Sequence, residues 1–267
     1  TDVWIDADVL GPPLPAGRIS PELRGRAALH ADGRIETVPS VDARDERDEV
    51  DLRLTVDPQG NAKGSLAVLL RGRAAQELAE ALARIVGDER QRMLRGVALA
   101  WVPFADVDDV VLSSTEESWQ VAIRASLVIP GYAQIEGGAA TRTWVLPGLD
   151  PIHTVFPRPG VYTLGATFAS KGGRKDALAV SRAMQYHVHR RVELPAGATV
   201  VRAPGALEVK DAVLAAQRRV AVSSASVEDD YNLSIATGTV SATDYGAFAT
   251  DAHRIDDGFL ASTRIKP

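Results

Sequence analysis

Short segments in which apolar and polar residues alternate, separated by glycine and proline turns, recur along most of this 267-residue chain. In 50–56 every second residue is valine or leucine and each residue between them is polar, and 119–127 has a similar period. Successive side chains of a β-strand point to opposite faces, so this period predicts strands with one face on a core and one in water. Turn sequences such as 157–160 and 195–197 separate these segments. The pattern predicts a mainly β fold, with antiparallel strands in a sandwich-like arrangement.

The strands are expected between residues 50 and 236. Two pairs should form hairpins, one around the turn at 57–61 and one about Ser223 and Ser224. The expected strands are 50–56, 62–70, 107–112, 119–127, 143–146, 161–169, 183–194, 206–209, 212–222 and 225–236.

One internal segment has helical rather than strand periodicity. Apolar residues from Ala75 to Ile85 fall on one helix face, which predicts a helical insert over about 73–95. Gly87 is placed to end a first helix, and Asp88 to cap a second, short one. A helical insert among so many strands is unusual for a simple sandwich.

The end of the chain also has helical spacing, and we expect a C-terminal helix over about 243–261. Its apolar stripe runs from Tyr245 to Phe259. The opposite face carries Asp251 and Asp257 rather than lysines, which favours a helix docked on the sheet over one lying on a membrane.

Composition and motifs exclude several classes of function. The net charge of −5 provides no basic surface for nucleic acid. The chain has no cysteine, which excludes disulfides, cysteine zinc sites and a thiol nucleophile within it. No apolar run approaches the roughly 20 residues that a membrane helix needs, and no transmembrane segment is expected. Phosphate-loop, dinucleotide, zinc-protease and calcium-loop motifs are missing from the sequence, so we predict no cofactor and no metal site.

The histidines and tryptophans have structural as well as functional interpretations. His187 and His189 are two residues apart on an expected strand, so both should point to one face, where a third ligand would complete a zinc site. Arg190 and Arg191 follow directly, which favours surface or half-buried histidines instead. The tryptophans could line a carbohydrate face, but we expect them mainly in the core. Neighbouring acids such as Asp229 and Asp230 would face opposite sides of a strand, so they suggest loops more than the carboxylate pair of a glycosidase.

The first residues of the chain, Trp4-Ile5-Asp6-Ala7-Asp8, resemble the last catalytic strand of a transglutaminase-like domain. Further segments, in the same order along the chain, resemble parts of bacterial transglutaminase-like proteins that carry an N-terminal β-sandwich domain of unknown function. The chain is similar to the end of the catalytic core, at 1–46 with a linker, followed by the C-terminal β-rich region, at 47–267. The further matching segments are 14–15, 23–29, 56–64, 72–75, 192–197 and 244–256.

This resemblance implies chemistry that this chain alone does not hold. The family uses a Cys-His-Asp triad, in which the aspartate orients the histidine that activates the thiol. Asp6 would be the triad aspartate, because it directly follows the apolar Trp4-Ile5 pair. Many members have Asp-Pro-Thr where this chain has Asp6-Ala7-Asp8, and this departure leaves Asp8 as the alternative. The cysteine and histidine would come from an upstream core, in the same or a companion chain.

Three hypotheses about function follow. The first is a non-catalytic C-terminal region of a transglutaminase-like cysteine protease or acyltransferase, which supports the core and binds a protein substrate or partner. The second is a stand-alone binding module for a protein or glycan at the cell surface. The third is a structural domain whose upstream core is degenerate. The resemblance implies a periplasmic or extracellular location.

Overall fold

The computed structural model gives a mainly β protein, with 46% strand and 22% helix. Its longest continuous stretches are 47–114 and 183–267. In full, the structure describes residues 4, 19, 23, 26–30, 32–39, 47–114, 120–137, 142–149, 163–180 and 183–267. Within these ranges no helix is long and apolar enough to cross a membrane.

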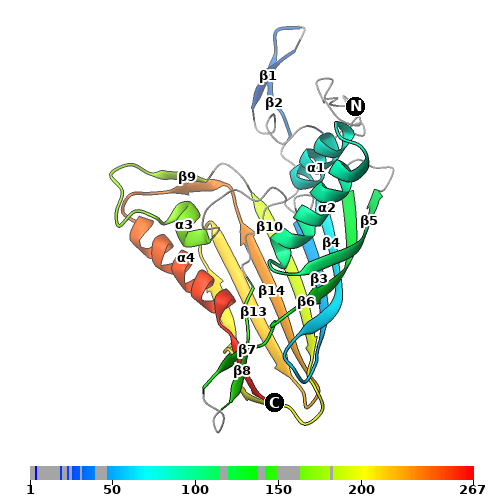
Figure 1. Cartoon of the computed structure of the whole chain (residues 1–267). Helices are drawn as coiled ribbons and strands as arrows, with labels where there is room; N and C mark the ends of the chain where they lie inside the picture. The colour runs from blue at the N-terminus through cyan, green and yellow to red at the C-terminus, as the bar shows by residue number, and fades with distance from the viewer. Residues whose placement is uncertain are drawn as a thin grey trace.

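A large mixed sheet forms the centre of the molecule (Figure 1), in the order β12-β13-β14-β10-β3-β4-β6-β5. Its strands are β3 (Arg47–Val56), β4 (Ala62–Arg71), β5 (Asp106–Ser114), β6 (Gln120–Ile129), β10 (Met184–Glu193), β12 (Leu207–Lys210), β13 (Leu214–Val222) and β14 (Ser226–Ile235). Neighbouring strands are antiparallel except β3 and β10, which are parallel. Both predicted hairpins, β3–β4 and β13–β14, are confirmed.

A smaller sheet and two strand pairs complete the β-structure. The four-stranded sheet, in the order β11-β16-β8-β7, contains β7 (Gln134–Glu136), β8 (Thr143–Leu146), β11 (Thr199–Arg202) and β16 (Thr263–Lys266). The strand pairs are β1 (Ala27–Leu29) with β2 (Ile35–Thr37), and β9 (Leu178–Val180) with β15 (Gly238–Val240).

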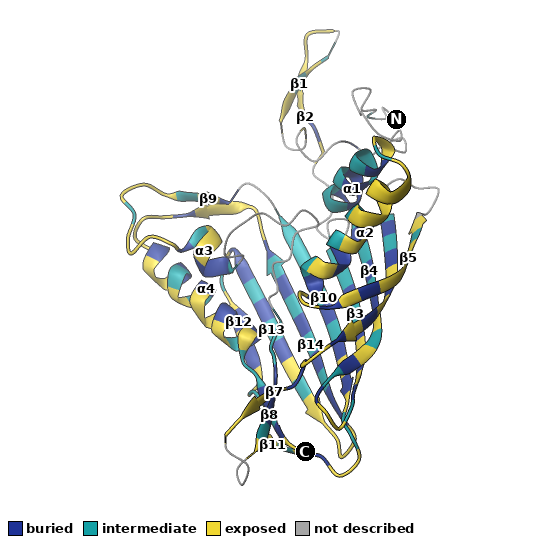
Figure 2. Ribbon diagram, in the orientation of Figure 1, coloured by how far each residue is buried: buried dark blue, intermediate teal, exposed yellow. Residues whose placement is uncertain are grey.

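The two faces of the large sheet differ in chemistry. Buried and more exposed residues alternate along the long strands (Figure 2), as in β3, where Leu52 and Leu54 are buried and Arg53 is exposed. We call the face that carries Leu52 the inner face, and the face that carries Arg53 the open face. The alternation predicted from the sequence therefore separates an apolar inner face from a polar open face.

Helices cover both ends of the inner face. Helices α1 (Arg73–Ala83) and α2 (Gly87–Trp101) pack on β4, β5 and β6, and α4 (Tyr245–Leu260) packs on β12 and β13. The apolar stripe of α4, with Phe248 and Phe259 fully buried, confirms the predicted docked helix. Trp101 and Trp144 are also buried, as predicted, whereas Trp4 is half-buried.

The helical insert is longer than predicted, because α2 continues to Trp101. Gly87 begins this helix rather than ending α1, which ends at Ala83 with Arg84 as its C-cap. The expected strand at 161–169 is wrong over its described part, where a short helix, α3 (Leu164–Phe168), is found instead. The Thr163 side chain caps this helix, and the Asp256 carboxylate of α4 accepts the Leu164 amide at 2.9 Å and the Gly165 amide at 2.7 Å. The Thr163 cap and the Asp256 carboxylate both accept hydrogen bonds from amides at the start of α3, and Asp256 is distant in sequence.

Candidate functional site

The open face of the large sheet carries an ordered array of polar side chains. In one row across the sheet, the register places Lys210, Ala215, Ser234, Gln185 and Arg47 side by side, on five successive strands. No helix or strand named above packs on this face. The open face therefore presents a row of polar side chains on five paired strands.

A second row runs beside the first. It contains Glu208, Gln217, Asn232 and His187, again on adjacent strands. Together the two rows combine amide, hydroxyl and charged groups over strands β12 to β3.

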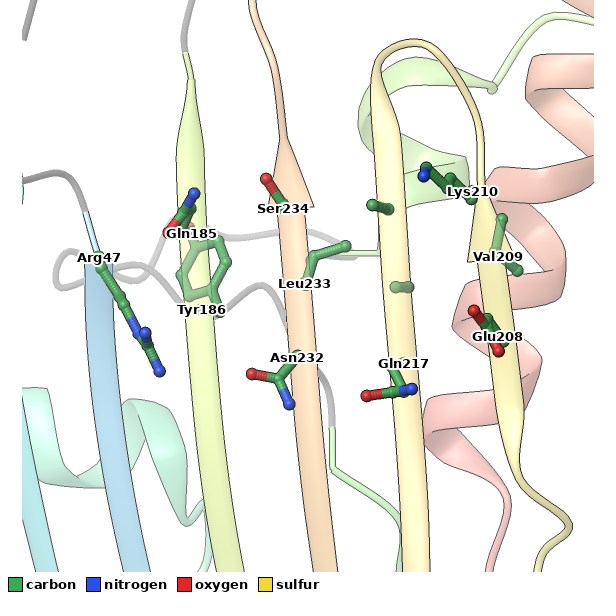
Figure 3. A pocket seen from close by; sticks show the side chains of 12 residues that line it. Arg47, Gln185, Tyr186, Glu208, Val209, Lys210, Gln217, Asn232, Leu233 and Ser234 are labelled. Atoms are coloured by element: carbon green, nitrogen blue, oxygen red, sulfur yellow. The ribbon is translucent and has the colours of Figure 1, made fainter. Parts of the chain in front are cut away.

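All members of the two rows except His187 line a shallow groove of about 270 Å³. Figure 3 shows side chains of Gln185, Asn232 and Gln217 projecting from three neighbouring strands along it. Arg47 stands at the β3 end of the groove and Lys210 at the β12 end. The polypeptide backbone of five strands holds these groups, so their spacing is fixed by the sheet.

Several of the lining groups have unused hydrogen-bonding capacity. The side chains of Gln185, Gln217 and Ser234 are half-buried and make no hydrogen bond to any residue that the structure describes. Lys210 likewise has no ion pair within the described ranges. Asn232 donates to Asp230 at 2.7 Å, and Arg47 lies 3.4 Å from Glu49. An amide has two donors and an accepting oxygen, so these groups can bind a ligand that itself both donates and accepts.

Paired polar side chains border the groove on the open face. His187 Nε2 lies 3.0 Å from the Asp230 carboxylate, and His189 occupies the next open-face position of the strand, which confirms that both histidines point to one face. Arg71 donates to Glu49 at 2.7 Å. Partial burial raises the pKa of Glu49, but the arginines outweigh it and hold this pKa below its usual value. Among the described residues, no group of three histidine, aspartate or glutamate side chains is arranged to hold a metal ion.

A second cluster of charges lies under the inner face and is fully enclosed. Asp229 is 0% exposed, between Arg190 at 1% and Arg218 at 0%. Arg190 Nε donates to one carboxylate oxygen at 3.1 Å, and Arg218 Nη2 donates to the other at 2.7 Å. The Arg218 guanidinium also lies over the Tyr231 ring, 4.8 Å from its centroid.

The contacts of these arginines explain the cluster as structural. Arg218 donates to the carbonyl oxygens of Gly258 at 2.7 Å and Ala261 at 2.8 Å, which fastens the end of α4 to the sheet. Arg190 donates to the carbonyl of Pro147, which follows β8. Strongly perturbed groups often mark active sites, but only where a substrate can reach them. This cluster instead holds the end of α4 and the residue after β8 to the large sheet.

The electrostatics of the cluster agree with this role. Burial raises the pKa of Asp229, but the two guanidinium groups outweigh it, so the pKa lies below its usual value. Burial also raises the pKa of Tyr231 to about 12. Asp229 therefore stays ionised, and Tyr231 and Arg190 stay protonated, over the physiological range.

The triad aspartate predicted from the sequence falls in a part of the chain that the structure does not describe. Asp6 and the alternative Asp8 lie outside the described residues, as do most of 1–46. Of the Trp4-Ile5-Asp6 segment the structure describes Trp4, whose ring meets the ring of His30 edge-on at 5.8 Å, beside the β1–β2 pair.

Sequence reasoning missed both clusters for different reasons. The groove combines residues from 47 to 234, and no local pattern connects them. The buried arginines did leave a signal: Arg190 occupies the same strand register as the apolar residues Val188 and Val192. An arginine in the inward phase of a strand indicates a buried, paired cation.

Comparisons with models of protein families, with curated proteins and with solved structures found no match to this chain. The fold and the site define a mainly β protein with one covered and one open sheet face, and a polar groove on the open face.

Proposed function

We propose that this chain is a non-catalytic binding region that holds an extended polypeptide segment in the groove on its open face. One observation carries the proposal: the side chains of Gln185, Gln217 and Ser234 line one groove and have no partner within the described part of the chain. A rigid sheet pre-organises these groups, so binding orders few side chains and loses little entropy.

The dimensions of the groove support an extended segment. It crosses five strands, and strands lie about 4.8 Å apart, so it is roughly 19 Å long. An extended chain advances about 3.3 Å per residue, so about six residues fit. Each peptide group offers one donor and one acceptor, which matches the side-chain amides of Gln185, Gln217 and Asn232.

The composition of the groove favours a polypeptide over a glycan. Among the described residues that line the groove, Tyr186 is the one aromatic residue, and it is only 6% exposed, so little of its ring is open to the apolar face of a sugar. Arg47 and Lys210, at opposite ends, would pair with acidic side chains or with a terminal carboxylate of the bound segment.

The test is a binding titration of the whole chain with a panel of hexapeptides, some neutral and some with terminal acidic residues, and with a malto-oligosaccharide. We expect the acidic peptides to bind most tightly and more weakly in high salt. Gln217→Leu, which keeps the size of the side chain and removes its amide, should weaken binding about tenfold.

Gln120→Leu is the matched control, because Gln120 is a half-buried glutamine on the same face, on β6 and outside the groove. Equal weakening by Gln217→Leu and Gln120→Leu would reject the groove as the site. Binding of the oligosaccharide alone would establish the glycan module instead.

An accessory role in a transglutaminase-like enzyme is the second candidate, and it is compatible with the first. Trp4 lies against the β1–β2 pair rather than in the large sheet, which is consistent with a first segment that belongs to a neighbouring unit. The upstream gene sequence tests this role, which requires a cysteine at the start of a helix and a histidine on a strand shortly before Thr1. Asp6→Ala in the reconstituted enzyme should then abolish peptide hydrolysis or acyl transfer, and unchanged activity would remove Asp6 from the triad.

A further inference from the structure

The turn after α2 contains a residue whose backbone angle and whose exposure are both unfavourable for stability. Phe104 has a φ of 71° and is 89% exposed. A bulky residue with positive φ is strained, and an exposed aromatic ring gains nothing from burial. Nothing within the described chain compensates for either feature at this position.

The turn that carries Phe104 is firmly held. Trp101, Val102 and Ala105 are buried on both sides of it. The amide of Val102 donates to Ala98 at 3.1 Å, and the amide of Ala105 donates to Val102 at 3.3 Å. The exposed ring is therefore presented on a rigid support, as expected of an anchor residue in a protein interface.

A second unfavourable residue lies on the same helix. Gly96 is in the middle of α2, where glycine is less favourable than alanine, and a Cβ atom at this position would meet nothing within 4 Å. No packing inside the chain requires this glycine. Its absent side chain allows another backbone to approach the helix closely.

The charges on this side of the helix indicate what approaches. Arg92 and Arg95 are exposed and lie within one turn of Gly96 on α2, and neither has an ion pair within the described residues. Leu99, 38% exposed, lies one turn further toward Phe104. Helical spacing thus puts Arg92, Arg95, Gly96 and Leu99 on one side of α2, and Phe104 follows in the turn after the helix.

We propose that this surface, formed by Arg92, Arg95, Gly96, Leu99 and Phe104, is a docking site for an acidic amphipathic helix of a protein partner. Carboxylates of the partner pair with Arg92 and Arg95, its backbone passes close to Gly96, and Phe104 enters an apolar pocket on it. A protein fits better than an anionic membrane, because a helix that crosses α2 at Gly96 leaves out the first turn, whereas a flat membrane would also lie against the exposed Asp88 and Glu89 in that turn. This site is independent of the groove on the open face.

The experiment uses the full chain and a synthetic helical peptide in which glutamates flank a leucine stripe, with a lysine version of that peptide as the control. We expect the glutamate peptide alone to bind, more weakly as salt rises. Phe104→Gly should weaken binding at least tenfold, whereas Val86→Ala, which shortens an equally exposed apolar side chain at the other end of α2, should not change it.

Stability measurements separate docking from a structural role. Phe104→Gly relieves the positive φ, and Gly96→Gln improves helix propensity, so each should raise Tm by about 2 °C while weakening binding. A fall in Tm with either variant would show that the residue serves the fold instead. Unchanged affinity in both variants, or no binding of the glutamate peptide, overturns the proposal. Binding of phosphatidylglycerol vesicles that requires Phe104, without peptide binding, would identify a lipid surface and also overturn it.

Discussion

Replacing Asp229 with alanine removes the carboxylate that two enclosed arginines share. Arg190 and Arg218 would remain 1% and 0% exposed, with like charges facing an empty site. Removing one partner of a buried ion pair typically reduces the free energy of unfolding by about 3–5 kcal/mol. In a protein of this size that corresponds to a fall in Tm of roughly 10 °C.

The assay is thermal and urea unfolding followed by circular dichroism, with Asp230→Ala as the control. Asp230 is the next residue along β14 and lies on the open face, paired with His187 at 3.0 Å. Loss of such a half-exposed pair changes stability by about 1 kcal/mol or less. Similar losses in the two variants would refute the argument that enclosure of the charges decides the effect.

A triple variant tests the same reasoning from the other direction. Arg190→Met, Asp229→Leu and Arg218→Met together remove every charge, so the penalty of an unpaired buried cation disappears. We expect this variant to be more stable than Asp229→Ala. It should still have a looser end of α4, because methionine cannot donate to the carbonyls of Gly258 and Ala261.

Three further predictions concern acid, sheet spacing and a helix cap. The pKa of folded Asp229 lies below the value of about 3.9 in an unfolded chain. Its contribution to stability is therefore complete above pH 4 and is lost as the pH falls toward the folded pKa. Unfolding measured as a function of acid pH should show this loss of stability in the parent and not in Asp229→Ala. Gly64→Ala should unfold at markedly lower urea, because the new Cβ would lie 1.8 Å from the Arg53 carbonyl oxygen, and an unchanged midpoint would contradict the β3–β4 spacing. Asp256→Ala leaves two buried amides unpaired and should cost about 1–3 kcal/mol, with faster hydrogen exchange at Leu164 and Gly165; unchanged exchange would show that Asp256 does not hold α3.

Local periodicity predicted most elements because it reports directly on burial. The residues of β3 alternate in the sequence and alternate in the structure, and the Tyr245 to Phe259 stripe became the buried side of α4. Local periodicity missed α3, whose five residues are too few for a helical period to appear, and short strands such as β7, β9 and β15, which have three residues each. The start of α3 is fixed by Asp256, about 90 residues later, which no local pattern can reveal.

Pairing between distant strands was beyond the reach of sequence patterns. Nothing in 47–56 identifies β10 as its neighbour, so neither the parallel pairing nor the groove that spans it was predictable. The histidine pair was different, because two residues of one strand share a face by geometry alone. The triad aspartate predicted at Asp6 remains a prediction that rests on resemblance.

The parallel pairing of β3 with β10 also divides the sheet by order of synthesis. Strands β3, β4, β6 and β5 come from residues 47–129, and β10, β14, β13 and β12 come from 184–235, so each half consists of strands near in sequence. While the ribosome makes the second half, β3 is the unpaired margin of the first, with the backbone hydrogen-bonding groups on that side free to join another chain. Closing the junction requires contacts more than a hundred residues apart, which form slowly. Premature self-association of the nascent protein would thus begin at β3. A truncated chain that ends before β10 would keep this unpaired strand edge permanently.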